Sequence, residues 1–308
     1  MSEKLFEEAL RLADKSWEEL LSLSDKLREE HKDSLVFTCA IINAKSGACS
    51  EDCAFCAQSI HHKTKIKIYP LIKTEEILKK AEQMKKSGAT RFSIVTSGKR
   101  PTKRELERIS EAIYQIKEKV GISTCASLGI LDKESAIMLK EAGLERYHHN
   151  LETSRSFFPN ICTTHAYEED IETVKIAKQV GLKVCSGGII GLGERWEHRI
   201  ELALTLKELN VDSIPINFLN PIAGTKLQDM PLLSPYEALK AVAIFRIINP
   251  EKDITICGGR ERVLGELQDK VFSAGANGIM IGNYLTTKGR SIKEDMEMIR
   301  RYGFKLEG

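Results

Sequence analysis

The chain has 308 residues, of which 42% are hydrophobic and only 8 are proline, so an ordered protein with a sizeable core is expected. Its 46 basic and 44 acidic residues leave a net charge of +2, which argues against a nucleic-acid partner. It has no apolar run near the ~20 residues of a membrane span, and its N-terminus lacks a secretory pattern. We therefore expect a cytoplasmic protein whose eight cysteines stay reduced.

The chain begins with a predicted helical extension over residues 1–31, followed by a strand at 36–42 (VFTCAII). After residue 65 one unit recurs, in which an amphipathic helix stops at a glycine and a short apolar strand follows. Its first copy is a helix over 74–86 with Thr74 as N-cap, then Gly88, then a strand at 91–97. Later strands are predicted at 122–128, 144–150, 182–190, 211–217 and 276–282, after the stops Gly121, Gly143, Gly181, Asn210 and Gly275. One more strand is predicted at 253–259 (DITICGG).

Eight strands that alternate with helices predict an α/β fold, a single (β/α)8 barrel of the TIM type with an N-terminal helical extension. A doubly wound open sheet is the rival fold for the same pattern. No linker interrupts the pattern, so residues 1–308 are expected to form one domain.

Three cysteines, Cys49, Cys53 and Cys56, lie within eight residues of the segment GACSEDCAFCAQS (47–59), directly after the first predicted strand. In such a barrel the active site lies at this end of the strands. Structural zinc uses four ligands, whereas three thiolates on a four-iron cluster leave one iron free for a substrate or cofactor. Three unrelated cysteines in a turn are the alternative.

The motif CxxxCxxC, with Phe55 before its last cysteine, resembles the radical S-adenosylmethionine enzymes. Nearly the whole chain resembles one family of them, the biotin synthases. The segments that carry this resemblance are GACSEDCAFCAQS, YHHNLETS (147–154), KVCSGGIIGLGE (183–194), SIPIN (213–217) and GGRE (258–261).

The resemblance implies that Cys49, Cys53 and Cys56 hold a [4Fe-4S] cluster whose open iron is chelated by S-adenosylmethionine. One electron then yields a 5′-deoxyadenosyl radical, which abstracts hydrogen from an unactivated carbon, so the cofactor carries the difficult chemical step. By the same resemblance Glu152 accepts hydrogen bonds from the ribose, where the family usually has Asp. Asn150 and Asn217 bind the ureido ring of the substrate. The residues implied to border the cofactor are Phe55, Gly188, Ile189 and Gly191.

Four further cysteines, Cys39, Cys125, Cys185 and Cys257, fall on predicted strands one, three, five and seven. Side chains from alternate strands share a layer inside a barrel, so these thiols are expected to converge around a second inorganic cluster. The alternative is four buried cysteines that act as small hydrophobic residues. Cys162 has no cysteine near it in sequence and is interpreted as a packing residue.

In the resembled family an auxiliary [2Fe-2S] cluster, bound by three cysteines and an arginine, donates the sulfur. Cys125, Cys185 and Arg260 match three of these ligands, but Ser93 stands at the fourth position. A neutral serine is a poor iron ligand, so we predict an auxiliary cluster, [2Fe-2S] or larger, that also uses Cys39 and Cys257.

The sequence thus predicts an enzyme that inserts sulfur into dethiobiotin to form biotin. A flavodoxin or ferredoxin-type electron donor and a homodimer are implied by the resemblance. The alternatives are a maturase-type radical enzyme on the same scaffold, or a non-catalytic iron–sulfur protein.

Overall fold

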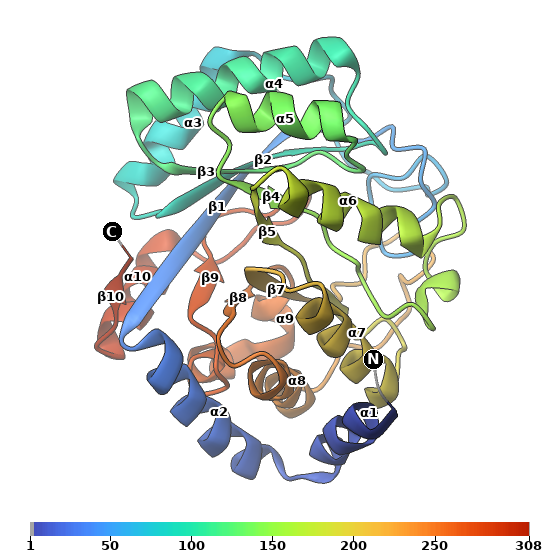
Figure 1. The fold of residues 1–308 in the computed structure, drawn as a ribbon, viewed down its shortest axis with the longest axis vertical. Helices are drawn as coiled ribbons and strands as arrows, with labels where there is room; N and C mark the ends of the chain where they lie inside the picture. Colours follow the sequence, from blue (N-terminus) through green and yellow to red (C-terminus); the bar gives the residue numbers. More distant parts are fainter. Residues whose placement is uncertain (1–2, 308) are drawn as a thin grey trace.

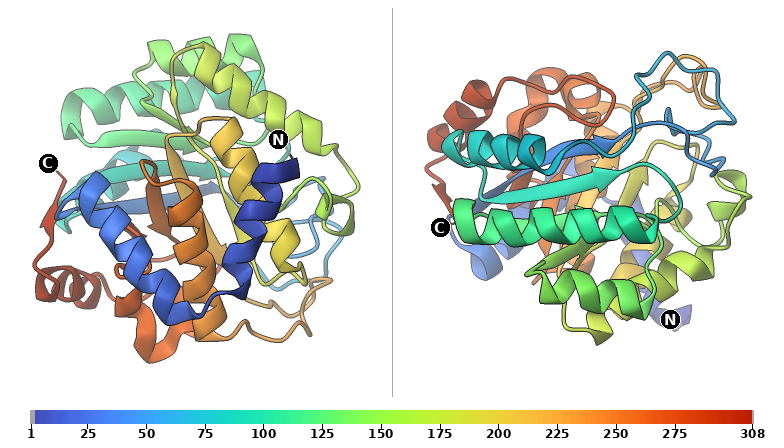
Figure 2. Two further views of the ribbon diagram at one scale, coloured as in Figure 1. Left: turned by 60° about the horizontal axis from the view of Figure 1, so that its bottom comes forward. Right: turned by 90° about the horizontal axis from the view of Figure 1, so that it is seen from above.

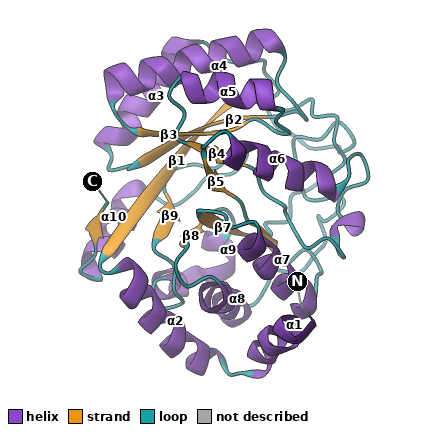
Figure 3. Cartoon of the chain, in the orientation of Figure 1, coloured by secondary structure: helices purple, strands orange, loops and turns teal. Residues whose placement is uncertain are grey.

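The computed structural model describes residues 3–307, which form a closed barrel of parallel strands surrounded by helices (Figure 1). Figure 3 shows the strands inside and the helices outside, the arrangement of a TIM-type barrel. The strands are β1 (Leu35–Lys45), β2 (Arg91–Thr96), β3 (Ser123–Ser127), β4 (Arg146–His148), β5 (Lys183–Cys185), β6 (Gly188–Ile190), β7 (Ser213–Phe218), β8 (Asp253–Ile256), β9 (Gly278–Met280) and β10 (Lys305–Leu306).

Pairing between the first and last barrel strands closes the sheet. β1 pairs with β2 on one side and with β9 on the other, where Thr38 lies opposite Ile279. An open doubly wound sheet would leave two edges, so that alternative is excluded. The predicted strand at 182–190 is split into β5 and β6, which both pair with β7. The break lies at Gly187, where a Cβ atom would come within 2.0 Å of the Pro215 carbonyl oxygen.

The helices cover the outside of the barrel, and the N-terminal extension adds a further layer (Figure 2). α1 packs against α7 and α2 packs against α8, so the predicted extension is confirmed from residue 3 onward, and residues 1–2 lie outside the described part. The helices are α1 (Glu3–Leu10), α2 (Trp17–Lys32), α3 (Thr74–Lys86), α4 (Lys103–Gln115), α5 (Lys133–Glu141), α6 (Tyr167–Gln179), α7 (Trp196–Glu208), α8 (Pro235–Ile248), α9 (Arg260–Leu264) and α10 (Ile292–Arg301).

The predicted helix stops have the backbone conformation that the sequence pattern requires. All six have positive φ, and the one that is not glycine, Asn210, has φ of 50°. Glycine and asparagine tolerate this left-handed conformation, so each helix can turn directly into the next strand. One detail differs: α3 starts at Thr74 itself, and Lys73 is its N-cap.

The core lies between the strands and the surrounding helices, with side chains such as Phe92, Ile109, Ile214 and Phe245 almost completely buried. β10, which was not predicted, adds to the start of β1, where Leu35 pairs with Lys305. Within residues 3–307 no helix combines the length and apolarity needed to cross a bilayer.

Candidate active site

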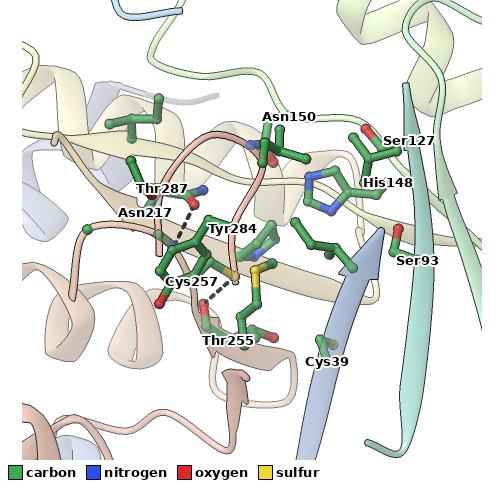
Figure 4. A pocket seen from close by; sticks show the side chains of 18 of the residues that line it. Cys39, Ser93, Ser127, His148, Asn150, Asn217, Thr255, Cys257, Tyr284 and Thr287 are labelled. Atoms are coloured by element: carbon green, nitrogen blue, oxygen red, sulfur yellow. Dashed lines mark hydrogen bonds between the residues drawn. The ribbon is translucent and has the colours of Figure 1, made fainter. Parts of the chain in front are cut away.

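A cavity of about 320 Å³ opens at the carboxyl ends of the barrel strands and reaches into the lumen (Figure 4). This volume is within the range of small-molecule sites. Residues from nearly every strand line it, together with the cysteine loop and the loop after β9. The predicted site residues in its wall are Cys39, Phe55, Cys56, Ser93, Cys125, Asn150, Glu152, Cys185, Ile189, Asn217 and Cys257.

The cysteine loop at the rim is closed by its own backbone. The Cys49 N–H donates to the Gln58 carbonyl at 3.0 Å, and the Ile60 N–H donates back to Cys49 at 2.9 Å. The Ser97 hydroxyl fixes the start of the loop, because it donates a hydrogen bond to the Gly47 carbonyl at 2.7 Å. The Cys49, Cys53 and Cys56 side chains are all partly exposed, so a cluster could reach all three.

Cys162 is not a simple packing residue, because its Sγ lies 3.8 Å from that of Cys53. The two cysteines are 109 residues apart. The short 3₁₀ turn at Phe158–Asn160 leads Cys162 back to the cysteine loop, a tertiary contact that no local sequence pattern encodes. The interpretation of Cys162 as a packing residue holds in that its side chain is buried in the core, but Cys162 also has in Cys53 a cysteine neighbour that the sequence did not reveal.

Glu152 is held at the cavity by an unusual backbone conformation. Its φ is 62°, in the left-handed region that a residue with a side chain rarely adopts. The Glu152 carbonyl accepts the Ile189 N–H at 2.8 Å, and a Cβ atom on Gly188 would lie 2.4 Å from the same oxygen. A glycine is therefore required at 188 for β6 to approach Glu152. Burial raises the pKa of the Glu152 carboxyl to about 7.

Asn150 and Asn217 both face the cavity, each fixed by bonds that leave part of its amide free (Figure 4). Asn150 accepts the Gly187 N–H at 3.2 Å and donates to the Glu152 carboxylate at 3.3 Å. Asn217 accepts the Gly258 N–H at 3.0 Å and donates to the Gly188 carbonyl at 3.3 Å. Because an amide offers two donors and two acceptor positions, each side chain keeps one of each for a ligand.

The glycine-rich turn after β6 is fixed by a buried ion pair that sequence reasoning missed. Glu194 accepts the Gly191 N–H at 2.9 Å and the Arg199 Nε–H at 2.6 Å. Phe55 and Ile189 pack beside this turn in a small apolar cluster. The turn therefore combines a rigid backbone with an apolar surface at the cavity rim.

The four thiols predicted to converge do line one cavity, from four different barrel strands or their ends. Cys39 lies on β1, Cys125 on β3 and Cys185 on β5, and Cys257 follows β8. Burial raises the pKa of Cys125 to about 11, and burial together with the neighbouring thiols raises those of Cys39 and Cys257 further. In this setting only a positive charge or a metal would stabilise the thiolates.

An unpartnered arginine lies among these thiols. Arg146 is 6% exposed and lines the cavity, and its Nε and Nη1 atoms have no hydrogen-bond partner in the described part of the chain. It pairs with Cys125 in the register of β3 and β4. Burying a guanidinium without an anion costs folding free energy, so this arginine favours a negatively charged ligand in the cavity. Four thiolates around iron would provide that charge.

Arg260 lies close enough to Cys257 for its charge to act on that thiol, but its hydrogen bonds go to other groups. Arg260 opens α9 after Gly259, which has φ of 84°, and its Nη2 donates to the buried Asp295 carboxylate at 2.6 Å. Its Nη1 donates to Gln268 at 2.8 Å, and the residue does not line the cavity. The chain turns into a helix between Cys257 and Arg260, and the Arg260 guanidinium still partly offsets the rise that burial causes in the pKa of Cys257.

Two family models match the chain. The one described as Radical SAM superfamily matches residues 44–206, and the one described as Biotin and Thiamin Synthesis associated domain matches residues 215–305. Curated biotin synthases match almost the whole chain. That of Geotalea daltonii is 54% identical over 300 residues (96% of this chain, 91% of the relative), and that of Pelotomaculum thermopropionicum is 50% identical over 301 (96% and 94%).

The chain belongs to the biotin synthase family. Solved structures of lower identity support its fold alone. Methylornithine synthase (PylB) superposes with a TM-score of 0.86 at 20% identity, covering 98% of this chain and 94% of its own. The [FeFe]-hydrogenase maturase HydG from Carboxydothermus hydrogenoformans gives 0.84 at 18% identity, covering 98% and 75%. As a radical S-adenosylmethionine enzyme of the biotin synthase family, the chain requires a [4Fe-4S] cluster and S-adenosylmethionine.

The raised pKa of Glu152 predicts that S-adenosylmethionine binds more tightly as pH rises from about 6 to about 8. By the resemblance Glu152 contacts the ribose of S-adenosylmethionine, and an ionised carboxylate is a better hydrogen-bond acceptor than the protonated form that prevails below a pKa of about 7. Equilibrium dialysis should show that the association constant for S-adenosylmethionine rises by up to roughly tenfold over this pH range. The Glu152→Gln variant should bind weakly with a flat profile. A parent profile as flat as that of the variant would show that Glu152 does not contact the ribose.

Proposed function

We propose that this protein is a biotin synthase, which inserts sulfur between two saturated carbons of dethiobiotin. The observation that carries the proposal is a single cavity that joins two sets of thiols. Cys56 of the three-cysteine loop lies at its rim, and Cys39, Cys125, Cys185 and Cys257 lie in its wall. A radical generator and a sulfur source can therefore face one substrate from opposite ends. The comparisons do not favour a maturase-type paralogue or a non-catalytic iron–sulfur protein.

The residues of the cysteine loop fit the radical cluster. Cys49, Cys53 and Cys56 offer three thiolates and no fourth from the same loop, which matches a cluster that keeps one iron for S-adenosylmethionine. When bound, the cluster supplies the electron that releases a 5′-deoxyadenosyl radical. The chain contributes position and shelter, because the barrel lumen holds the reacting carbon close and limits water.

The S-adenosylmethionine site is proposed to lie between the cysteine loop and β6. Glu152 would accept the ribose hydroxyls, since its carboxylate faces the cavity and its backbone is fixed to Ile189. Phe55 and Ile189 would cover the adenine, because they belong to one apolar cluster beside the cavity. Gly188 and Gly191 would give the cofactor close access to the backbone.

Dethiobiotin is proposed to bind with its ureido ring between Asn150 and Asn217. The ring presents two N–H donors and a carbonyl acceptor, and each asparagine keeps a free donor and acceptor toward the cavity. Asn150 follows β4 and bonds to Gly187, whereas Asn217 lies on β7 and bonds to Gly188. The two amides therefore come from the strands on either side of the β5–β6 segment.

We propose that Cys39, Cys125, Cys185 and Cys257 hold the auxiliary cluster. Four thiols from four separate strands can supply one thiolate to each iron of a four-iron cluster, the larger of the two cluster types that the sequence predicts. Arg146 would offset the negative charge of the cluster and donate hydrogen bonds to its sulfur atoms. Arg146 would thus contribute a positive charge to this centre beside Arg260, whose charge acts on Cys257.

Three further features are proposed from the family and the sequence. A flavodoxin or ferredoxin-type protein would supply electrons, the enzyme would be a homodimer, and it would work in the cytoplasm, where thiols stay reduced. We also propose one domain, because residues from both family-model regions line the same cavity, for example Cys125 from the first and Thr255 from the second.

The ureido site predicts that Asn217→Ala weakens dethiobiotin binding by on the order of 1–3 kcal/mol, since a buried hydrogen-bond partner is lost. Isothermal titration of anaerobic enzyme loaded with S-adenosylmethionine measures this affinity. The iron content and the visible spectrum of the clusters should not change. The Asn150→Ala variant should behave in the same way. Dethiobiotin affinities equal to that of the parent in both variants would contradict the ureido assignment.

The auxiliary site predicts that Cys185→Ala still produces 5′-deoxyadenosine but forms no biotin, because its sulfur source is lost. Ser93→Ala is the matched control: Ser93 lines the same cavity beside Cys125, and a hydroxyl binds iron poorly. It should keep full iron content and still make biotin. Product analysis and iron determination under strict anaerobiosis measure biotin formation, 5′-deoxyadenosine formation and iron content in the two variants. Loss of biotin in Ser93→Ala with biotin retained in Cys185→Ala would overturn the ligand set.

A further inference from the structure

The segment that follows the cysteine motif carries positive charge and no negative charge. Residues 54–74 contain four lysines and no aspartate or glutamate, whereas the whole chain has 46 basic and 44 acidic residues. Three of these lysines, Lys63, Lys65 and Lys67, are exposed and are called the basic strip below. Their ammonium groups form no ion pair in the described part of the chain, whereas exposed lysines of α1, α2 and α10 pair with glutamates four residues away. The chain itself therefore leaves the charge of the basic strip uncompensated.

The same segment exposes the two most accessible large hydrophobic side chains among the described residues. Ile60 is 63% exposed and Ile68 is 68% exposed, against 52% or less for the other exposed side chains of this kind. Both lie over the start of the cysteine loop. The Ile60 N–H donates to the Cys49 carbonyl at 2.9 Å, and a Cβ atom on Gly47 would lie 2.6 Å from Ile68 Cγ1. Exposed apolar side chains with charged residues around them are typical of protein interfaces.

The backbone of this segment is fixed to its neighbours. Ser46 and Tyr69 exchange two backbone hydrogen bonds of 3.1 Å, and the Lys63 N–H donates to the Gly224 carbonyl at 3.1 Å. Gly224 is required there, because a Cβ atom would lie 2.3 Å from the Lys63 carbonyl oxygen. The loop of the basic strip and the loop after β7 accordingly lie side by side in Figure 2. A partner would thus meet a preformed surface and lose little free energy in ordering it.

This surface lies directly outside the ligands of the radical cluster. The His62 ring donates from Nδ1 to the Cys56 carbonyl at 2.8 Å, and the Thr64 hydroxyl donates to the Ala57 carbonyl at 2.6 Å. The basic strip does not line the cavity, so its lysines are not ligands of the substrate or of S-adenosylmethionine. Electron transfer slows steeply with distance, so an external electron should enter where the cluster ligands lie close to the surface.

We propose that the basic strip, together with Ile60 and Ile68, is the docking surface of an acidic one-electron carrier protein. Negative charges on the carrier would be attracted to the lysines, and the two isoleucines would form the apolar contact. The carrier loses one electron and the radical cluster gains it. A small surface suffices, because electron-transfer complexes are transient. The inference rests on the proposed function, which needs an external electron for each S-adenosylmethionine cleaved.

The test uses anaerobic enzyme with its clusters in place and a reduced, strongly acidic flavodoxin as the probe. Stopped-flow absorbance of the flavodoxin semiquinone gives the second-order rate constant of electron transfer. In the triple variant Lys63→Glu, Lys65→Glu and Lys67→Glu this rate constant should fall at least about tenfold at low ionic strength, because attraction becomes repulsion. The difference should shrink at about 0.5 M salt, where charges are screened over a few ångströms.

The matched control is the triple variant Lys86→Glu, Lys175→Glu and Lys207→Glu. These exposed lysines lie in the C-terminal halves of α3, α6 and α7, toward the opposite face of the barrel, and the net charge changes equally. The control should react with flavodoxin at the parent rate. Reduced methyl viologen, a small cation that needs no docking surface, should reduce both variants at least as fast as the parent. Biotin formation with viologen as the reductant tests the proposed function separately.

A basic-strip variant that flavodoxin reduces as fast as the parent would overturn the docking proposal. An equal loss of rate in the control variant would do the same, since it would indicate an effect of net charge alone. Parent-like reduction of the basic-strip variant, combined with loss of its binding to vesicles of anionic lipid, would assign the surface to a membrane instead.

Discussion

The positive charge of Arg146 inside the barrel is the constraint to which the rest of the site responds. The Arg146 guanidinium lies in a cavity wall with two nitrogens that nothing in the described chain satisfies, and such a charge is tolerated only beside an anion. Buried thiols alone cannot provide it, because burial raises the pKa of Cys125 to about 11. Iron would remove those protons, so the arginine and a thiolate-bound cluster would stabilise each other.

The barrel makes this centre and the radical centre neighbours. Alternate strands deliver thiols to the lumen, while the loop after β1 carries its three cysteines over the rim. Between the two centres, the strand that comprises β5 and β6 is interrupted at Gly187. The interruption leaves backbone groups of Gly187 and Gly188 free to bond with Asn150 and Asn217, and it brings Gly188 against the Glu152 carbonyl. The strained φ of Glu152 fits a side chain that must face the cavity from the end of a strand.

The sequence predicted the features that depend on local signals. The helix stops, the eight barrel strands and the convergence of the thiols follow from periodicity, from glycine conformation and from the layer rule of barrels. The contact between Cys162 and Cys53 could not be predicted, because two loops meet there only after folding. Arg146 was missed because a charged residue near the start of a strand usually faces solvent. Arg260 was assigned by resemblance, and the helix that starts at this residue turns it toward Asp295.

The central claim is that one barrel holds two clusters, the second on four thiols beside Arg146. Mössbauer spectroscopy of anaerobically purified enzyme, combined with iron and sulfide analysis, tests it most directly. The account predicts two four-iron clusters, about eight irons per chain, of which only one changes its spectrum when S-adenosylmethionine is added. About four irons in a single cluster, or the spectrum of a two-iron cluster beside the first, would contradict it.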